Sequence, residues 1–193
     1  MKKRIKIHGF LIFLGAILII IFPKAFLRLE RSGYDLSMFI CGLVFLFSGF
    51  YLRICARGYK AEHSDKSKKL VTGGPYSLTR NPMYLGIFLI AIAIILLGFK
   101  IWVLAAFLIF FIACYVRLMS EEENKLTRDF GQEYINYKNK TPLFLPKLSN
   151  LFKKEALKKL SVKPGWIKKE ISALAPVLLV ATAFNLWKLF VSS

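Results

Sequence analysis

Residues 73–86 read GGPYSLTRNPMYLG, and this polar turn leads directly into a long apolar stretch. Asn81 is of a type that caps helices, and Pro82 suits the first helical position because its missing N–H costs no hydrogen bond there. The pattern therefore predicts a helix that begins at Pro82 with Asn81 as its cap. Arg80 and Tyr84 then fall on one face, and we expect the rest of the chain to be organised around this boundary.

The composition is that of an integral membrane protein. Of the 193 residues, 56% are hydrophobic, and several apolar runs carry almost no charge. A helix of about 20 apolar residues crosses a bilayer. The sequence predicts an all-α integral membrane protein with about five transmembrane helices, at 7–27, 36–56, 83–99, 101–116 and 171–187. Because only the short break at 98–100 divides two of these runs, residues 83–116 are predicted to form a tight helical hairpin.

The net charge of +18 lies between the apolar runs and not on a soluble basic face. Most of the 29 Lys and Arg residues fall in the N-terminal tail and in segments 57–80 and 117–169. This distribution favours a lipid bilayer containing anionic lipids as the partner and disfavours nucleic acid. It also predicts a multi-pass protein with these three segments, including the N-terminus, in the cytoplasm. The polar segments on either side of the hairpin then meet at one face of the membrane.

The three cysteines, Cys41, Cys55 and Cys114, lie within or at the end of apolar runs, with no CxxC spacing and no His nearby. We interpret them as helix-packing residues and predict no metal site.

Three motifs occur in a set order. Gly74-Pro75-Tyr76 is followed by RNPMYLG at 80–86, and after the hairpin come EENKLTRDFGQEYINY at 122–137 and a stretch with two prolines at 141–146. In this order and spacing they resemble the superfamily of isoprenylcysteine carboxyl methyltransferases and phospholipid methyltransferases, which are membrane-embedded enzymes. The resemblance covers about residues 70–148. The first two apolar runs and the C-terminal segment lie outside it.

The resemblance implies that S-adenosylmethionine is the cofactor. Glutamates offer acceptors for its ammonium group or ribose, and the start of the helix with Arg80 and Asn81 suits its carboxylate. Tyrosines can contact the sulfonium or stack on the base. The residues that the resemblance assigns to cofactor binding are Gly74, Tyr76, Arg80, Asn81, Tyr84, Leu85, Glu122 and Glu123.

Methyl transfer is a displacement in which the enzyme mainly positions donor and acceptor and excludes water. The predicted catalytic residues are Arg80, Glu122 and Lys140. The resemblance implies a lipophilic acceptor. An isoprenylcysteine carboxylate-like acceptor needs a cationic clamp from Arg or Lys, whereas a phospholipid amine-like acceptor needs a general base. Asn81 stands where the family has His, and Lys140 where the prenylcysteine enzymes have Arg. An imidazole at position 81 is thus excluded, and the residues leave the acceptor open.

On this interpretation the chain has three parts. Residues 1–56 form two N-terminal transmembrane helices. Residues 57–148 form the catalytic core, with a polar loop at 57–70, the cofactor-binding loop, the hairpin and a polar cytoplasmic helix at 117–137 that continues directly from the fourth apolar run. Residues 149–193 form an amphipathic interfacial helix at 151–160 and the last transmembrane helix. Tyr134 and Tyr137 are interpreted as anchors in the aromatic belt. The alternatives are a non-enzymatic helical membrane protein, as a scaffold or lipid-binding module, and a reductase-like relative with another cofactor.

Overall fold

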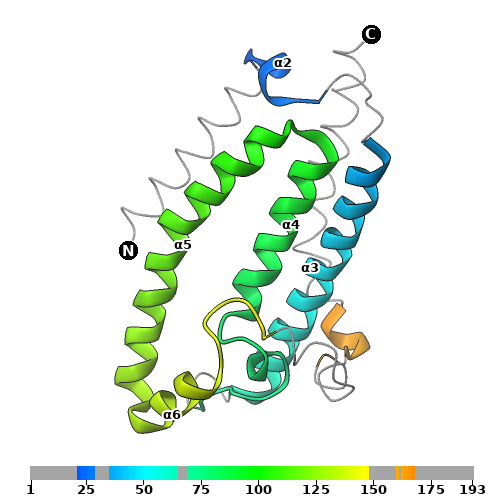
Figure 1. Ribbon diagram of the computed structural model, residues 1–193. Helices are drawn as coiled ribbons and strands as arrows, with labels where there is room; N and C mark the ends of the chain where they lie inside the picture. Colours follow the sequence, from blue (N-terminus) through cyan, green and yellow to red (C-terminus); the bar gives the residue numbers. More distant parts are fainter. Residues whose placement is uncertain (1–20, 29–34, 65–68, 148–159, 161, 168–193) are drawn as a thin grey trace.

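The computed structural model describes residues 21–28, 35–64, 69–147, 160 and 162–167, and Figure 1 shows their arrangement. The described part of the chain is helical, with no strand, which confirms the all-α prediction. Its elements are the short helix α2 (Pro23–Phe26), α3 (Asp35–His63), the 3-10 turn η2 (Gly74–Ser77), α4 (Pro82–Gly98), α5 (Ile101–Phe130) and α6 (Gln132–Lys140).

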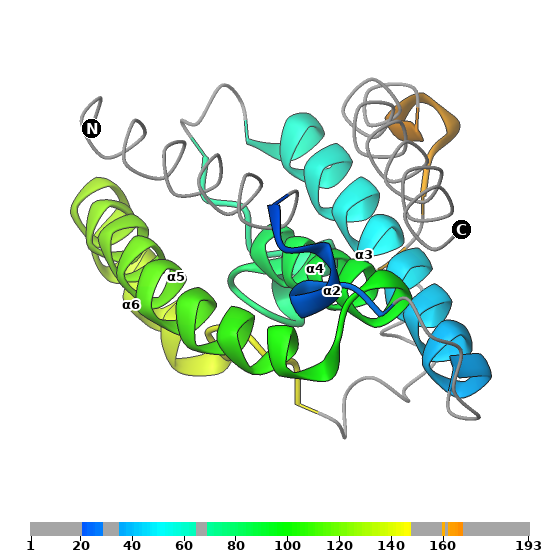
Figure 2. The ribbon, with the colours of Figure 1, turned by 90° about the horizontal axis from the view of Figure 1, so that it is seen from above.

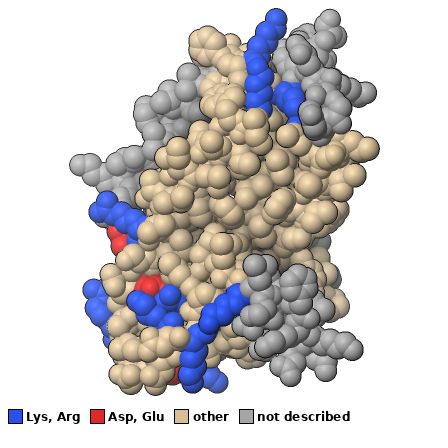
Figure 3. Space-filling view, in the orientation of Figure 1, with Lys and Arg blue, Asp and Glu red and all other residues tan. Residues whose placement is uncertain are grey.

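Two helices are long and apolar enough to cross a membrane, at Leu36–His63 and Ile101–Phe130, and α4 is a shorter apolar helix. Large apolar side chains on both long helices face outward, as Phe47 at 69% and Ile109 at 72% exposure illustrate. In the view of Figure 3 the described charged side chains gather at two ends, with an uncharged band between them. Such a band suits the hydrocarbon of a bilayer. The predicted spans at 7–27 and 171–187 and the amphipathic helix at 151–160 lie almost entirely outside the described residues.

Helices α3 and α4 lie side by side along their length (Figures 1 and 2). Two glycines allow this. A Cβ atom on Gly49 would lie 2.8 Å from the Gly86 carbonyl oxygen, and one on Gly86 would lie 2.9 Å from the Gly49 carbonyl oxygen. Small residues at such a crossing let helix backbones approach closely, and in lipid this close packing is a main source of helix association.

The predicted hairpin is present, with its tip at Phe99 and Lys100 between α4 and α5. The two helices diverge from the tip, and aromatic side chains pack between them. The ring centroids of Phe88 and Phe111 are 4.6 Å apart, and Phe144, from the segment after α6, lies 5.4 Å from Phe88 and 5.6 Å from Phe111. The segment with two prolines therefore closes the gap between the hairpin helices.

The hairpin tip is covered by residues 23–28. The Lys100 amide donates to the Phe26 carbonyl at 2.9 Å, and the Arg28 amide donates to the Gly98 carbonyl at 3.1 Å. Leu27 is extended and fully buried here. The predicted first span was therefore wrong at its end, because the separate short helix α2 begins at Pro23 and the backbone is extended at Leu27, where it crosses the tip.

Two further boundaries differ from the prediction. Residues 57–63, expected in a loop, continue α3 to His63 because their side chains find partners on several sides, as described below. Helix α5 runs without a break from the apolar run through the polar residues to Phe130, as predicted. The polar helix does not reach residue 137 unbroken, since Gly131, with φ of 52°, separates α5 from α6.

We expect Gly49→Val to lower stability by about 1–3 kcal/mol, because the added methyl groups overlap the backbone of α4. Thermal unfolding in detergent measures this. Ser48→Val adds similar bulk on the exposed neighbouring position of α3 and should change the midpoint little. Equal effects of the two substitutions would contradict the close approach of α3 to α4.

Candidate active site

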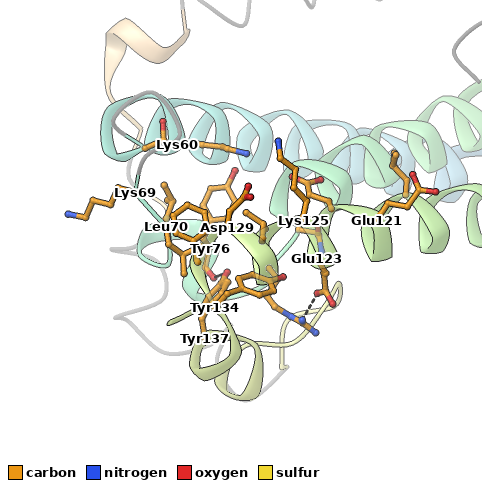
Figure 4. Close-up of a pocket in the computed structure, with 18 residues that line it drawn as sticks. Lys60, Lys69, Leu70, Tyr76, Glu121, Glu123, Lys125, Asp129, Tyr134 and Tyr137 are labelled. Carbon is orange, nitrogen blue, oxygen red and sulfur yellow. Dashed lines mark hydrogen bonds and ion pairs between the residues drawn. The ribbon is translucent and has the colours of Figure 1, made fainter. Parts of the chain in front are cut away.

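A cavity of about 400 Å³ lies at the polar end of the helices, where the end of α3, residues 69–81, the polar half of α5 and α6 come together (Figure 4). This volume lies within the range of small-molecule pockets. Side chains of both charges line it together with tyrosines. They are the basic residues Lys60, Lys69, Arg80 and Lys125, the acidic residues Glu121, Glu122, Glu123 and Asp129, and Tyr76, Tyr134 and Tyr137.

A buried ion pair joins the turn before α4 to the polar half of α5. The Arg80 guanidinium contacts the Glu123 carboxylate, and Lys138 of α6 reaches the other Glu123 oxygen at 3.2 Å. Both members of the first pair are about nine-tenths buried. The backbone of Arg80 is held as well, because its amide donates to the Pro142 carbonyl at 2.9 Å. The pair therefore fixes three segments of the cavity wall to one another.

Three consecutive glutamates of α5 have three different surroundings. Glu121 forms an exposed i,i+4 pair with Arg117, and Glu123 is paired with Arg80. Glu122 accepts a hydrogen bond from the Tyr84 hydroxyl at 3.0 Å. No Lys or Arg among the described residues forms an ion pair with Glu122. Of the three glutamates, Glu122 is therefore the one whose carboxylate lines the cavity without an ion pair to a described residue.

Tyr76 presents a buried hydroxyl to the cavity. The residue is 8% exposed, and its hydroxyl has no hydrogen-bond partner among the described residues. Burial raises the pKa of Tyr76, and the negative charge of Glu122 raises it further, so the hydroxyl stays protonated as a donor. A buried polar group without a partner is costly, which points to a ligand as the missing partner.

Two tyrosines of α6 hold this arrangement. The Tyr137 hydroxyl donates to the Tyr76 carbonyl at 2.6 Å. Tyr134 is 1% exposed and interacts with Arg80 and Glu123. Burial and then the charge of Glu123 raise the pKa of Tyr134 to about 12. Their interpretation as aromatic-belt anchors was wrong. The spacing offered a signal, because residues three apart on a helix share a face.

The turn at 73–74 is shaped by the close approach of Tyr59. Gly74 has a φ of 55°, and a Cβ atom there would lie 2.6 Å from the Tyr59 ring. Only glycine adopts this conformation readily and leaves room for the ring. Gly74, predicted to contact the cofactor, thus lies against Tyr59 and does not line the cavity.

Asn81 occupies the cap position of α4 but does not cap the helix. Its side-chain amide donates to the Leu143 carbonyl at 3.0 Å instead, so the predicted capping interaction was wrong. The Thr79 hydroxyl donates to the same carbonyl at 3.2 Å. Asn81 nevertheless lines the cavity. Pro82 begins α4, as predicted.

The structure gathers five of the predicted site residues around the cavity and places four elsewhere. Those lining it are Tyr76, Arg80, Asn81, Glu122 and Glu123. Tyr84 reaches the site through Glu122, Leu85 is buried on α4, Gly74 packs on Tyr59, and Lys140 lies at the exposed end of α6. The sequence analysis missed Lys60, Lys69, Lys125 and Asp129. Their positions depend on the extension of α3 and on the angle of α5, for which the sequence carried no signal.

Apolar helices with a mixed-charge cavity at their polar end indicate a helical membrane protein with a candidate ligand site. The family model for phospholipid methyltransferases matches residues 34–133, just over half of the chain, and the chain belongs to this family. The resemblance noted in the sequence is thereby confirmed.

Individual relatives include two proteins named as methyltransferases and one that is named otherwise. The chain is 31% identical over 156 residues to a protein-S-isoprenylcysteine O-methyltransferase of Saccharomyces cerevisiae, covering 75% of this chain and 64% of the relative. It is 32% identical over 115 residues to the Xenopus laevis protein of the same name, covering 55% and 40%. It is 35% identical over 91 residues to the nickel-cobalt-cadmium resistance protein NccN of Alcaligenes xylosoxydans xylosoxydans, covering 47% and 42%. The chain thus spans between two fifths and just under two thirds of these relatives' lengths. No solved structure matches.

We expect Arg80→Leu to destabilise the protein by roughly 3 kcal/mol, because Glu123 would keep only its longer contact with Lys138 in a buried setting. Arg117→Leu is the matched control, since its ion pair is exposed and contributes about 0.5 kcal/mol or less. Thermal unfolding of the two variants measures the difference. Similar thermal unfolding midpoints for the two variants would show that the buried Arg80 pair does not stabilise the fold more than the exposed one.

Proposed function

We propose that this protein is an S-adenosylmethionine-dependent methyltransferase that acts on a lipophilic acceptor at a membrane surface. The observation that carries the proposal is the buried, unpartnered hydroxyl of Tyr76 in a cavity lined by both signs of charge. Membership of the phospholipid methyltransferase family supports methyl transfer as the reaction.

The lining residues fit this cofactor, which carries an ammonium group, a carboxylate and ribose hydroxyls and supplies a methyl group on a positively charged sulfur. Glu122, with one oxygen held by Tyr84, offers its carboxylate to the ammonium group or the ribose. Tyr76 is a donor, and the Arg80 Nε has no hydrogen-bond partner among the described residues and can serve the carboxylate. These residues bind and orient, and the buried wall around them excludes water.

The acceptor is proposed to be isoprenylcysteine carboxylate-like or phospholipid amine-like. Relatives are named for isoprenylcysteine O-methylation and the family for phospholipid methylation. A carboxylate needs a cation beside it, for which Lys140 at the exposed end of α6 stays a candidate. An amine needs a base, and Glu122 is the cavity carboxylate suited to that role. The two cases call for different residues, so acceptor assays of the corresponding variants distinguish them.

We further propose a multi-pass protein in a bilayer with anionic lipids, with the N-terminus and the cavity on the cytoplasmic side. Described residues of the basic segments 57–80 and 117–169 line the cavity, and Lys and Arg concentrate on the cytoplasmic side of membrane proteins. A lipophilic acceptor, either a small molecule or a lipidated peptide, would then reach the cavity from the membrane.

Purified protein in detergent should bind S-adenosylmethionine or its demethylated product in a calorimetric titration. Glu122→Gln should weaken this binding at least tenfold, because the carboxylate loses its charge. Glu133→Gln on the exposed surface of α6 is the matched control and should leave binding unchanged. No binding by the unmodified protein would overturn the proposal and favour a scaffold or lipid-binding module. A labelled-methyl assay with lipid amines and prenylcysteine analogues then identifies the acceptor.

Tyr76→Phe should separate binding from stability. Removal of an unpartnered buried hydroxyl should leave the thermal midpoint of the ligand-free protein unchanged or raise it. Affinity for the cofactor should fall about 2- to 13-fold, which corresponds to one hydrogen bond of about 0.5–1.5 kcal/mol. A lower midpoint with unchanged affinity would mean that the hydroxyl serves the fold and not a ligand.

A further inference from the structure

The end of α3 touches three neighbours through three successive pairs of residues. Consecutive positions on a helix are turned by about 100°, so the i,i+4 pairs 58/62, 59/63 and 60/64 lie on three different faces. The first pair receives Trp166, the second covers the turn at Gly73 and Gly74, and the third lines the cavity.

The first face forms a seat for Trp166. The indole ring occupies the space that a side chain on Gly58 would fill, and Trp166 is only 7% exposed. Its Nε1 donates to one Glu62 oxygen at 2.7 Å, and Lys163 reaches the other Glu62 oxygen at 2.6 Å. The Lys163 ammonium also lies 5.5 Å from the centre of the indole ring. One short turn therefore satisfies both oxygens of Glu62 and fills the notch at Gly58.

The second face carries the start of the cavity wall. Tyr59 stacks on His63 with ring centroids 3.9 Å apart, and its ring lies against Gly73 and Gly74. Tyr76 follows directly in the η2 turn. The position of the buried Tyr76 hydroxyl thus depends on the place of Tyr59.

The third face is part of the cavity itself. Lys60 and Ser64 line it, and the Ser64 amide continues the helical pattern with a hydrogen bond to the Lys60 carbonyl at 3.0 Å. Because one helical turn carries all three faces, a shift at the Trp166 seat moves the cavity wall as well.

We infer that Trp166 is a positioning residue for the ligand cavity. Seated by Gly58 and Glu62, it holds the last turns of α3, and through them Lys60 and the turn that carries Tyr76. It does not line the cavity. Trp166 lies beyond residues 34–133, which the family model matches. The part of this inference that concerns a ligand rests on the proposed function.

The test compares Trp166→Ala and Trp166→Phe with Ile167→Ala, whose side chain is an exposed neighbour. Hydrogen exchange is measured for amides 58–64 and 73–78 and, as an internal reference, for amides 88–98 of α4. Trp166→Ala should speed exchange at least tenfold in the first two segments and leave α4 unchanged. Trp166→Phe should give a smaller effect, because an aromatic ring remains at the seat, although the phenyl is smaller than the indole and lacks its N–H. Ile167→Ala should change nothing.

Calorimetry on the same variants measures affinity for the demethylated cofactor product, which Trp166→Ala should weaken at least fivefold. Unchanged exchange in both segments, or exchange that rises equally in α4, would overturn the inference, the latter by showing general destabilisation. If the unmodified protein binds no cofactor while the local exchange pattern appears, the proposed function fails and the coupling of Trp166 to the cavity wall stands.

A second variant tests the seat from its other side. Gly58→Ala should displace the indole ring and reproduce the exchange pattern of Trp166→Ala. In the background of Trp166→Ala, the same Gly58 substitution should add little, because neighbouring sites that share one interaction are not additive. Full additivity of the two substitutions would contradict a shared seat.

Discussion

A buried ion pair between Arg80 and Glu123 connects the two ends of the α4–α5 hairpin. Desolvation of both charges is expensive, and close contact together with the further cation of Lys138 offsets the cost. The pair acts across helices that diverge from their tip, so it sets the distance between the turn before α4 and the polar half of α5. The cavity, with Glu122 and Tyr76 on its wall, lies between this turn and the polar half of α5.

The helices and half of the site could be predicted because their signals are local. Pro82 begins α4, the break at Gly98 to Lys100 turns the chain, and the motifs bring Tyr76, Arg80, Glu122 and Glu123 to one end of the hairpin. Each of these follows from neighbouring residues or from the length of an apolar run.

The remainder could not be predicted because it depends on partners distant in the chain. Asn81 carries the signature of a cap, yet the Leu143 carbonyl competes for its amide. Tyr134 and Tyr137 are residue types typical of a membrane interface, and the sequence does not reveal that α6 packs against Arg80 and Tyr76. The last turns of α3 were predicted to be a polar loop. Their packing partner Trp166, which contacts Gly58 and Glu62, lies more than a hundred residues later in the chain, so local sequence gives no sign of it.

Helix α5 is one continuous rod of 30 residues, about 45 Å long at 1.5 Å per residue, whereas the bilayer core is about 30 Å thick. The excess of about ten residues is the part that bears the glutamates. With the cavity at a membrane surface, as proposed, a single helix serves both the lipid and the site. In that placement, a change in bilayer thickness that tilts α5 would also move Glu122, so the lipid surroundings become a variable of the cavity's own geometry.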